Sequence, residues 1–207
     1  MKLSFIFLAL LTCPLVKSQS FEGVITYQIS YSSKLPNVTS EQFSSMMGTT
    51  QEYYIKHWKY KSVSNGSLSE WQLYVPSENR LYNKFNMSDT LLWNDGGVNA
   101  DKVVSYEIKK SQAEVLGYNC DALILNTQSG KTIYYYNDKL KVDLNLYKNH
   151  RYGNWALIME QTKSLALKME IETPQFSMTS VAVQVKEMEL PDSFFALPEA
   201  PAKKSPY

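Results

Sequence analysis

Histidines and cysteines, which often bind metals or act as nucleophiles, are scarce in this chain. The two histidines, His57 and His150, do not form a metal-spaced pair such as His-x-x-x-His. Cys120 has no cysteine partner at the spacing of a zinc knuckle. We therefore predict no metal site and no cofactor.

Carboxylates are the more abundant candidates for chemistry, because two of them close together can act as a general acid and base. The candidates in the sequence are Asp89, Asp95, Asp101, Glu107, Glu160, Glu170 and Glu172. Glu170 and Glu172 alternate with apolar residues, which favours the solvated face of a strand. The sequence has no Gly-x-Ser-x-Gly motif, no P-loop and no dinucleotide-binding glycine pattern. We predict no catalytic residues, and a hydrolase that uses carboxylates or Cys120 is one alternative.

Alternation of apolar and polar residues dominates the rest of the sequence and predicts β-strands. The pattern is clearest in residues 21–31, 140–146, 164–172 and 181–186. Weaker segments rich in Tyr, Trp, Val and Ile lie at 52–58, 59–64, 68–75, 80–85, 90–93, 103–109, 122–127 and 132–136. Short turn signals between them, such as Asn137-Asp138, favour hairpins over βαβ crossovers. The sequence thus predicts a mostly β fold with an antiparallel sheet.

One short helix is predicted among these strands. Thr39 is a favourable N-cap, and Gln42 three residues later completes a capping box. Phe43, Met46 and Met47 then form an apolar stripe, and Gly48 is a helix stop. A helix this short needs tertiary packing for its stability, so we expect it to lie against the sheet.

The N-terminus has the pattern of a secretory signal peptide. Lys2 precedes a short apolar run from Leu3 to Leu11, and Ser18 is a small residue at the predicted cleavage point. The run is too short to span a membrane. We expect export, to the periplasm or as a secreted protein, and no transmembrane span. Leu10-Leu11-Thr12-Cys13 also resembles the box before a lipidated cysteine, so lipid anchoring at Cys13 is an alternative.

Removal of this leader has consequences for charge and for domain organisation. Loss of Lys2 and Lys17 changes the formal net charge from +1 to −1, which argues against a nucleic-acid partner. The predicted organisation is a signal peptide at 1–18, a single antiparallel β domain at 19–198 and a Pro-rich flexible tail at 199–207.

Several stretches resemble an uncharacterised family of exported bacterial proteins. They are residues 21–27 at the opening strand, 116–122 with 132–136 in the middle, and 165–172 with 186–198 at the close. That family is similar in turn to the outer-membrane lipoprotein carriers. The resemblance implies an antiparallel half-open barrel, with one or a few short helices against its concave face. It also implies binding of a hydrophobic ligand in the cavity.

The alternating strands and the short helix together provide a predicted ligand-binding set. It consists of Ile25, Tyr27, Ile29, Phe43, Met46, Val142, Leu144, Leu167 and Met169. The partner would be a lipid or another hydrophobic small molecule. The same residues have the pattern of an ordinary filled core. A filled core would favour the other alternative, a cell-envelope module that binds another envelope protein through an exposed patch.

Overall fold

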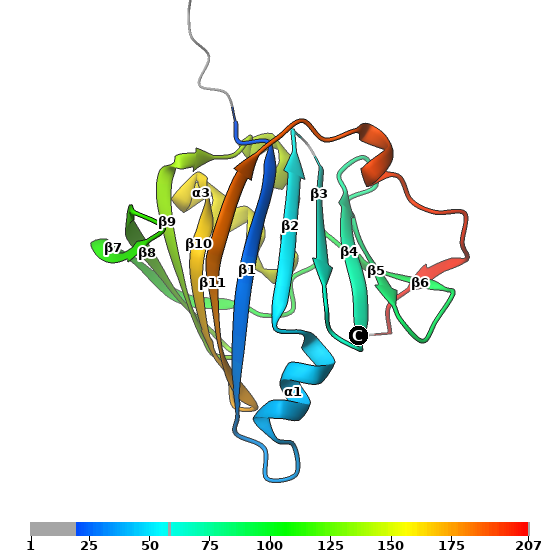
Figure 1. Cartoon of the computed structure of the whole chain (residues 1–207), viewed down its shortest axis with the longest axis horizontal. Coiled ribbons are helices and arrows are strands. Elements are labelled where there is room, and N and C mark those ends of the chain that lie inside the picture. The colour runs from blue at the N-terminus through cyan, green and yellow to red at the C-terminus, as the bar shows by residue number, and fades with distance from the viewer. Residues whose placement is uncertain (1–19, 58, 207) are drawn as a thin grey trace, which may run out of the picture.

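The computed structural model describes residues 20–57 and 59–206, and shows a mostly β protein built around one sheet (Figure 1). The strands are β1 Gly23–Ser33, β2 Thr50–Lys56, β3 Lys59–Ser64, β4 Ser69–Val75, β5 Arg80–Phe85, β6 Leu91–Asp95, β7 Val103–Val115, β8 Tyr118–Thr127, β9 Lys131–Lys141, β10 Ser164–Glu172, β11 Phe176–Glu187 and β12 Ala202–Lys204. Their order in the sheet is β12-β6-β5-β4-β3-β2-β1-β11-β10-β9-β8-β7. The predicted mostly β fold is confirmed, and the sheet is open, with β12 and β7 at its edges. The predicted signal peptide at 1–18 lies outside the described residues.

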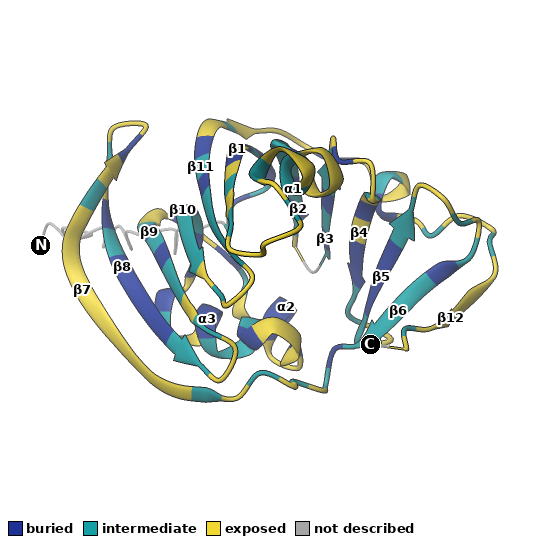
Figure 2. Ribbon diagram, turned by 90° about the horizontal axis from the view of Figure 1, so that it is seen from below, coloured by how far each residue is buried: buried dark blue, intermediate teal, exposed yellow. Residues whose placement is uncertain are grey.

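The helices are few and short. They are α1 Ser40–Met47, α2 Leu144–Tyr147, η1 Tyr152–Asn154, α3 Trp155–Thr162 and η2 Asp192–Phe195. The sheet is strongly curved, and α2 and α3 lie inside its curve (Figure 2). We call the face of the sheet that looks toward α2 and α3 the concave face, and the opposite one the outer face. Within residues 20–57 and 59–206, no helix is long and apolar enough to cross a membrane.

Strand β1 lies in the middle of the sheet and shows the alternation expected of it. Ile25, Tyr27 and Ile29 are buried on the concave face, whereas Gln28 and Ser30 are exposed. β1 pairs with β2 on one side and with β11 on the other, both antiparallel. β1 and β11 are far apart in the sequence, and their pairing connects the two halves of the sheet.

Helix α1 forms at the predicted position. The Thr39 hydroxyl accepts a hydrogen bond from the Gln42 amide, and the Gln42 side chain accepts one from the Thr39 amide, which completes the capping box. The helix lies at the end of the sheet beside β1 (Figure 1). Phe43 packs on Tyr31 and Phe176, with ring centroids 6.3 and 5.2 Å away.

The strand predicted at residues 140–146 is wrong over most of its length. β9 continues through the predicted turn at Asn137-Asp138 and ends at Lys141, after which the chain turns into α2. Asp143 causes this change locally, because its carboxylate accepts a hydrogen bond from the Asn145 amide as a helix N-cap. Leu146 is therefore buried from a helix, and Leu144 is exposed.

The C-terminal residues also differ from the predicted flexible tail. Residues 202–204 form β12, which pairs in parallel with β6, so the sheet is not entirely antiparallel. The amide of Leu91 donates to the carbonyl of Pro201, and the amide of Ser205 donates to the carbonyl of Trp93. Unpaired backbone groups of the β6 edge are the physical reason for this docking.

Two cores lie on the two faces of the sheet. The larger one fills the concave face and includes Ile25, Leu123, Leu167, Tyr147 and Ile158. The smaller one lies on the outer face of the β3–β6 half, where residues 188–204, here called the C-terminal segment, cover the strands. Its members are Trp71, Leu73, Tyr82, Leu91, Leu190 and Phe195.

Candidate functional site

The nine residues of the predicted ligand-binding set fall into three groups. Ile25, Ile29, Val142 and Leu167 are buried in the main core. Ile25 and Leu167 are 0% exposed, so they cannot contact a ligand without rearrangement of their neighbours. For these four residues, the structure favours the filled-core interpretation of the sequence pattern.

A second group lies away from the centre of the concave face. Phe43 packs at the end of the sheet between Tyr31 and Phe176. Met46 and Leu144 are 44% and 39% exposed, on α1 and α2 respectively. The structure therefore does not bring these three side chains together with the rest of the set.

The remaining pair, Tyr27 and Met169, lines a cavity of about 180 Å³ on the concave face. The cavity lies between the sheet and the segment that contains η1 and the start of α3. Its lining residues are Tyr27, Gln51, Tyr53, Tyr60, Ser62, Gln72, Leu81, Tyr152, Gly153, Trp155, Leu165, Ala166 and Met169. Most of this lining is aromatic or aliphatic, so the cavity is the candidate ligand site of the described chain.

An aromatic cluster supports the wall of this cavity. The hydroxyls of Tyr53 and Tyr147 lie 2.8 Å apart, and the hydroxyl of Tyr60 lies 2.6 Å from Nε2 of His150. The imidazole of His150 stacks on Tyr74, with ring centroids 4.1 Å apart. These contacts fix the orientation of the rings, because each buried phenol has a defined hydrogen-bond partner.

The cluster is electrically neutral at ordinary pH. Desolvation by burial lowers the pKa of His150 to about 3, so the imidazole carries no charge. The same desolvation raises the pKa of Tyr27, Tyr53 and Tyr60 above the usual range of a phenol. The hydroxyl of Tyr27 donates to the carbonyl of Ala166, another residue of the lining, so this phenol also has a defined hydrogen-bond partner.

A row of apolar side chains extends from the cavity to the β7 edge of the sheet. Residues directly opposite each other on paired strands share a face. By this register, Met169, Tyr134, Leu123 and Ile108 lie side by side on the concave face. Leu123 is buried, but Ile108 and its neighbour on the same face, Tyr106, are 40% and 47% exposed. The concave face therefore carries exposed apolar surface near β7.

A larger hollow, of about 530 Å³, lies at the strand ends near α2 and the C-terminal segment. Its lining includes Lys59, Val75, Asn145, Phe195 and Leu197. Lys59 places a cation in this hollow, which distinguishes it from the cavity on the concave face.

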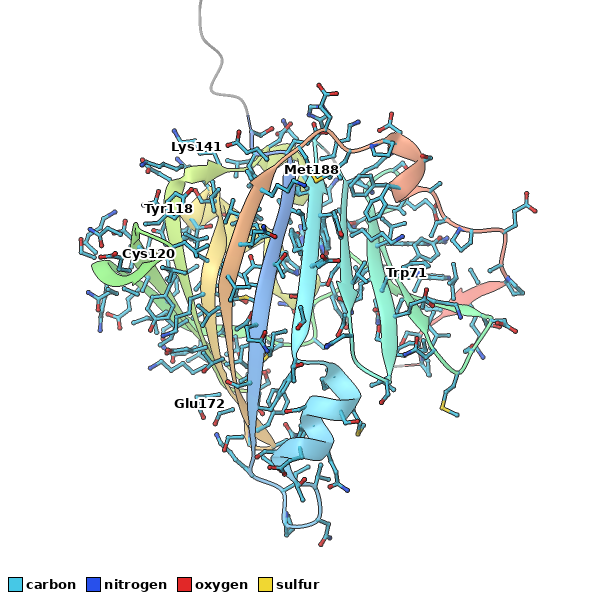
Figure 3. All side chains as sticks on the ribbon, in the orientation of Figure 1. Trp71, Tyr118, Cys120, Lys141, Glu172 and Met188 are labelled. Atoms are coloured by element: carbon cyan, nitrogen blue, oxygen red, sulfur yellow. The ribbon has the colours of Figure 1, made fainter. Side chains whose placement is uncertain are left out.

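Cys120 and the carboxylates do not converge on the cavity. Cys120 is fully buried on β8, in the opposite half of the sheet from Trp71 (Figure 3), and its thiol donates to the carbonyl of Tyr118. Burial raises the pKa of this thiol. Glu170 forms an ion pair with Lys168, and Glu172 forms one with Lys34, as expected for solvated strand residues. Among the described residues, no group of three or more His, Cys, Asp or Glu side chains could hold a metal ion.

Sequence reasoning missed the part of the site that comes from η1 and α3. Trp155 and Tyr152 line the cavity, but no helix was predicted there. A signal does exist, since Trp155, Ile158, Met159 and Thr162 have the i, i+3, i+4, i+7 spacing of a helix face. Gln51, Ser62 and Gln72 had no such signal, because they come from three different strands.

Comparison with known proteins gives no further constraint on the site. No protein-family model matches the chain, and no curated protein matches it.

Proposed function

We propose that this is an exported, non-enzymatic protein that binds a hydrophobic ligand, such as part of a lipid, in the cavity on the concave face. The observation that carries the proposal is the cavity itself, with its wall of tyrosine, tryptophan and aliphatic side chains. Export follows from the leader pattern at residues 1–18.

The size of the cavity limits what it can enclose. An apolar cavity of about 150 Å³ binds one benzene ring. The cavity of about 180 Å³ therefore suits one ring or a short stretch of acyl chain. Burial of such a group contributes about 25 cal/mol per Å² of apolar surface before the costs of association.

A longer ligand has a route beyond the cavity. The row from Met169 to Ile108 continues the apolar surface toward β7, and Tyr106 and Ile108 remain exposed on it. We take the curved, open sheet as the half-open barrel that a likeness to the lipoprotein carriers implies. In that arrangement, a lipid chain would lie along this row, with its end in the cavity.

The assignment as non-enzymatic rests on Cys120 and the acidic residues. A catalytic cysteine needs a thiolate, and burial disfavours the thiolate of Cys120. Partial burial favours a raised pKa of Asp101, but hydrogen bonds from Ser129 act against it and the pKa is lowered. A hydrogen bond from Lys34 lowers the pKa of Glu172. These acids therefore stay ionised, whereas a general acid needs a raised pKa.

The β7 edge favours one second candidate, a module that binds another envelope protein. β7 spans thirteen residues, and among the strands of residues 20–57 and 59–206 it pairs only with β8. Val104, Tyr106 and Ile108 expose 69%, 47% and 40% of their surface. An exposed edge with apolar side chains can pair with a strand of another chain.

The proposal is tested by titration with N-phenyl-1-naphthylamine, a neutral probe that fluoresces in apolar surroundings. Its phenyl ring matches the size of the cavity, and its naphthyl group would lie outside, along the apolar row from Met169 to Ile108. We expect saturable enhancement at one probe per protein. Met169→Trp, which fills the lining, should abolish the enhancement. Met47→Trp, the same change on the exposed side of α1, should leave it intact. No enhancement, or equal enhancement in both variants, would contradict a ligand site in the cavity and favour the β7 module.

A further inference from the structure

One part of the cavity wall is polar but uncharged. This polar part is formed by Gln51 on β2, Ser62 on β3 and Gln72 on β4. Ser62 lies directly opposite Gln72 in the register of β3 and β4. Nε2 of Gln51 donates to Oγ of Ser62 over 2.8 Å, and Nε2 of Gln72 donates to Oδ1 of Asn83 over 2.7 Å. These bonds hold the two amides in place, one between β2 and β3 and the other between β4 and β5.

The same bonds leave hydrogen-bonding capacity for a ligand. Both amides use their nitrogen, and no donor among the described residues bonds to Oε1 of Gln51 or of Gln72. Ser62 accepts through Oγ, so its own hydroxyl hydrogen is available to donate. Ser62 is only 6% exposed, whereas Gln72 opposite it is exposed, so a polar group that meets Ser62 loses part of its contact with bulk water.

The lining contains no Lys, Arg, Asp or Glu among the described residues. A carboxylate or phosphate placed beside Ser62 would lose hydration without gaining a counter-charge, which is strongly unfavourable. A hydroxyl or amide loses much less, because the two glutamine oxygens and the serine hydroxyl replace its hydrogen bonds to water.

We propose that the ligand of the concave cavity is neutral, and combines an apolar ring or chain with a hydroxyl or amide group that meets Gln51 and Ser62. This inference rests on the proposed function and defines its ligand class. A fatty-acid carboxylate or a phosphate headgroup does not enter this site.

The test uses three small probes of one shape: toluene, benzyl alcohol and benzoate. Binding is followed at the indole N–H resonance of Trp155 in two-dimensional NMR, assigned with Trp155→Phe. This local readout is needed because Lys59 gives the other hollow a cation that could attract benzoate. We expect benzyl alcohol to bind at Trp155 roughly tenfold or more tightly than benzoate.

A pair of variants tests the role of the polar wall. Gln51→Leu should weaken benzyl alcohol binding about three- to tenfold and leave toluene binding unchanged. Gln28→Leu, the same change at an exposed position of β1, should alter neither.

The outcomes separate this inference from the function it rests on. Benzoate binding at Trp155 as tightly as benzyl alcohol would overturn the neutral-ligand inference, but would keep the cavity as a ligand site. The same holds if Gln51→Leu weakens toluene and benzyl alcohol equally. If none of the three probes moves the Trp155 resonance, the ligand site itself is wrong, and the inference falls with it.

Discussion

His150 is a buried core residue, although histidine is often a catalytic residue or a metal ligand. Its side chain is fully buried, stacks on Tyr74 and bonds to Tyr60 through Nε2. Nδ1 makes no hydrogen bond to the described residues, so no second group stabilises a protonated ring. Burial thus holds the imidazole in its neutral form.

The first prediction concerns the pH dependence of stability. The folded pKa of His150, about 3, lies below its unfolded value of about 6.5, so the unfolded chain binds more protons between these limits. The free energy of unfolding should therefore fall as pH drops from about 6.5 toward 3, by up to about 1.4 kcal/mol per pH unit. Urea unfolding at a series of pH values measures this slope.

Two variants isolate the contribution of His150 to that slope. His150→Phe keeps a ring but cannot be protonated, so the slope between pH 6.5 and 4 should become shallower. His57→Gln, at a half-exposed side chain, should leave most of the slope. An unchanged slope in His150→Phe would show that other groups cause the acid sensitivity.

The second prediction separates core residues from cavity residues within the predicted set. Leu167→Ala should lower the free energy of unfolding by about 2–5 kcal/mol, because Leu167 is 0% exposed, and should leave probe affinity nearly unchanged. Met169→Ala should lower stability by about 1 kcal/mol and weaken probe binding. Urea unfolding and N-phenyl-1-naphthylamine titration of both variants measure the two effects. If Leu167→Ala weakened probe binding and Met169→Ala did not, Leu167 would belong to the cavity and Met169 to the core.

At the scale of elements, local signals decided which segments could be predicted. α1 was predictable because Thr39 and Gln42 encode its start within four residues, and β1 because its alternation is regular. Residues 140–146 alternate as regularly, yet β9 ends at Lys141 and the Asp143 cap starts α2 at Leu144. Alternation alone does not distinguish these two outcomes, since a short apolar segment can be buried from either conformation.

The third prediction tests the α1 cap. Thr39→Ala removes the hydroxyl that accepts from the Gln42 amide and should destabilise the protein by about 1 kcal/mol. Ser45→Ala, at an exposed position inside α1, should change stability by less than about 0.5 kcal/mol. Thermal unfolding of both variants gives the comparison. Equal stability of the two would mean that the cap does not hold α1.

At the scale of the whole molecule, the order of strands could not be predicted from sequence. β1 pairs with β11 across most of the chain, and β12 returns to pair with β6. The cavity is formed by these long-range pairings, which bring β2, β3, β4 and β10 around α3. Only Tyr27 and Met169 of the cavity lining were predicted, because they follow the alternation of their own strands.

The fourth prediction concerns the C-terminal segment. A chain that ends at Pro198 loses β12 and the hydrogen bond from the Leu91 amide to Pro201. Leu91, now 1% exposed, should lose its protection from amide hydrogen exchange, and stability should fall by about 1–3 kcal/mol. A chain that ends at Ser205 keeps β12 and serves as the control. If amide exchange at Leu91 were unchanged in the shorter chain, β12 would not protect β6, and residues 199–207 would behave as the predicted flexible tail.

Native mass spectrometry of the mature protein, purified gently from its own host and followed by solvent extraction, would detect a hydrophobic ligand held in the concave cavity. We expect one neutral molecule per protein that is released on denaturation, is lost from Met169→Trp, and is retained in Met47→Trp. A wild-type protein that carries nothing, or a bound molecule unaffected by Met169→Trp, would contradict ligand binding in this cavity.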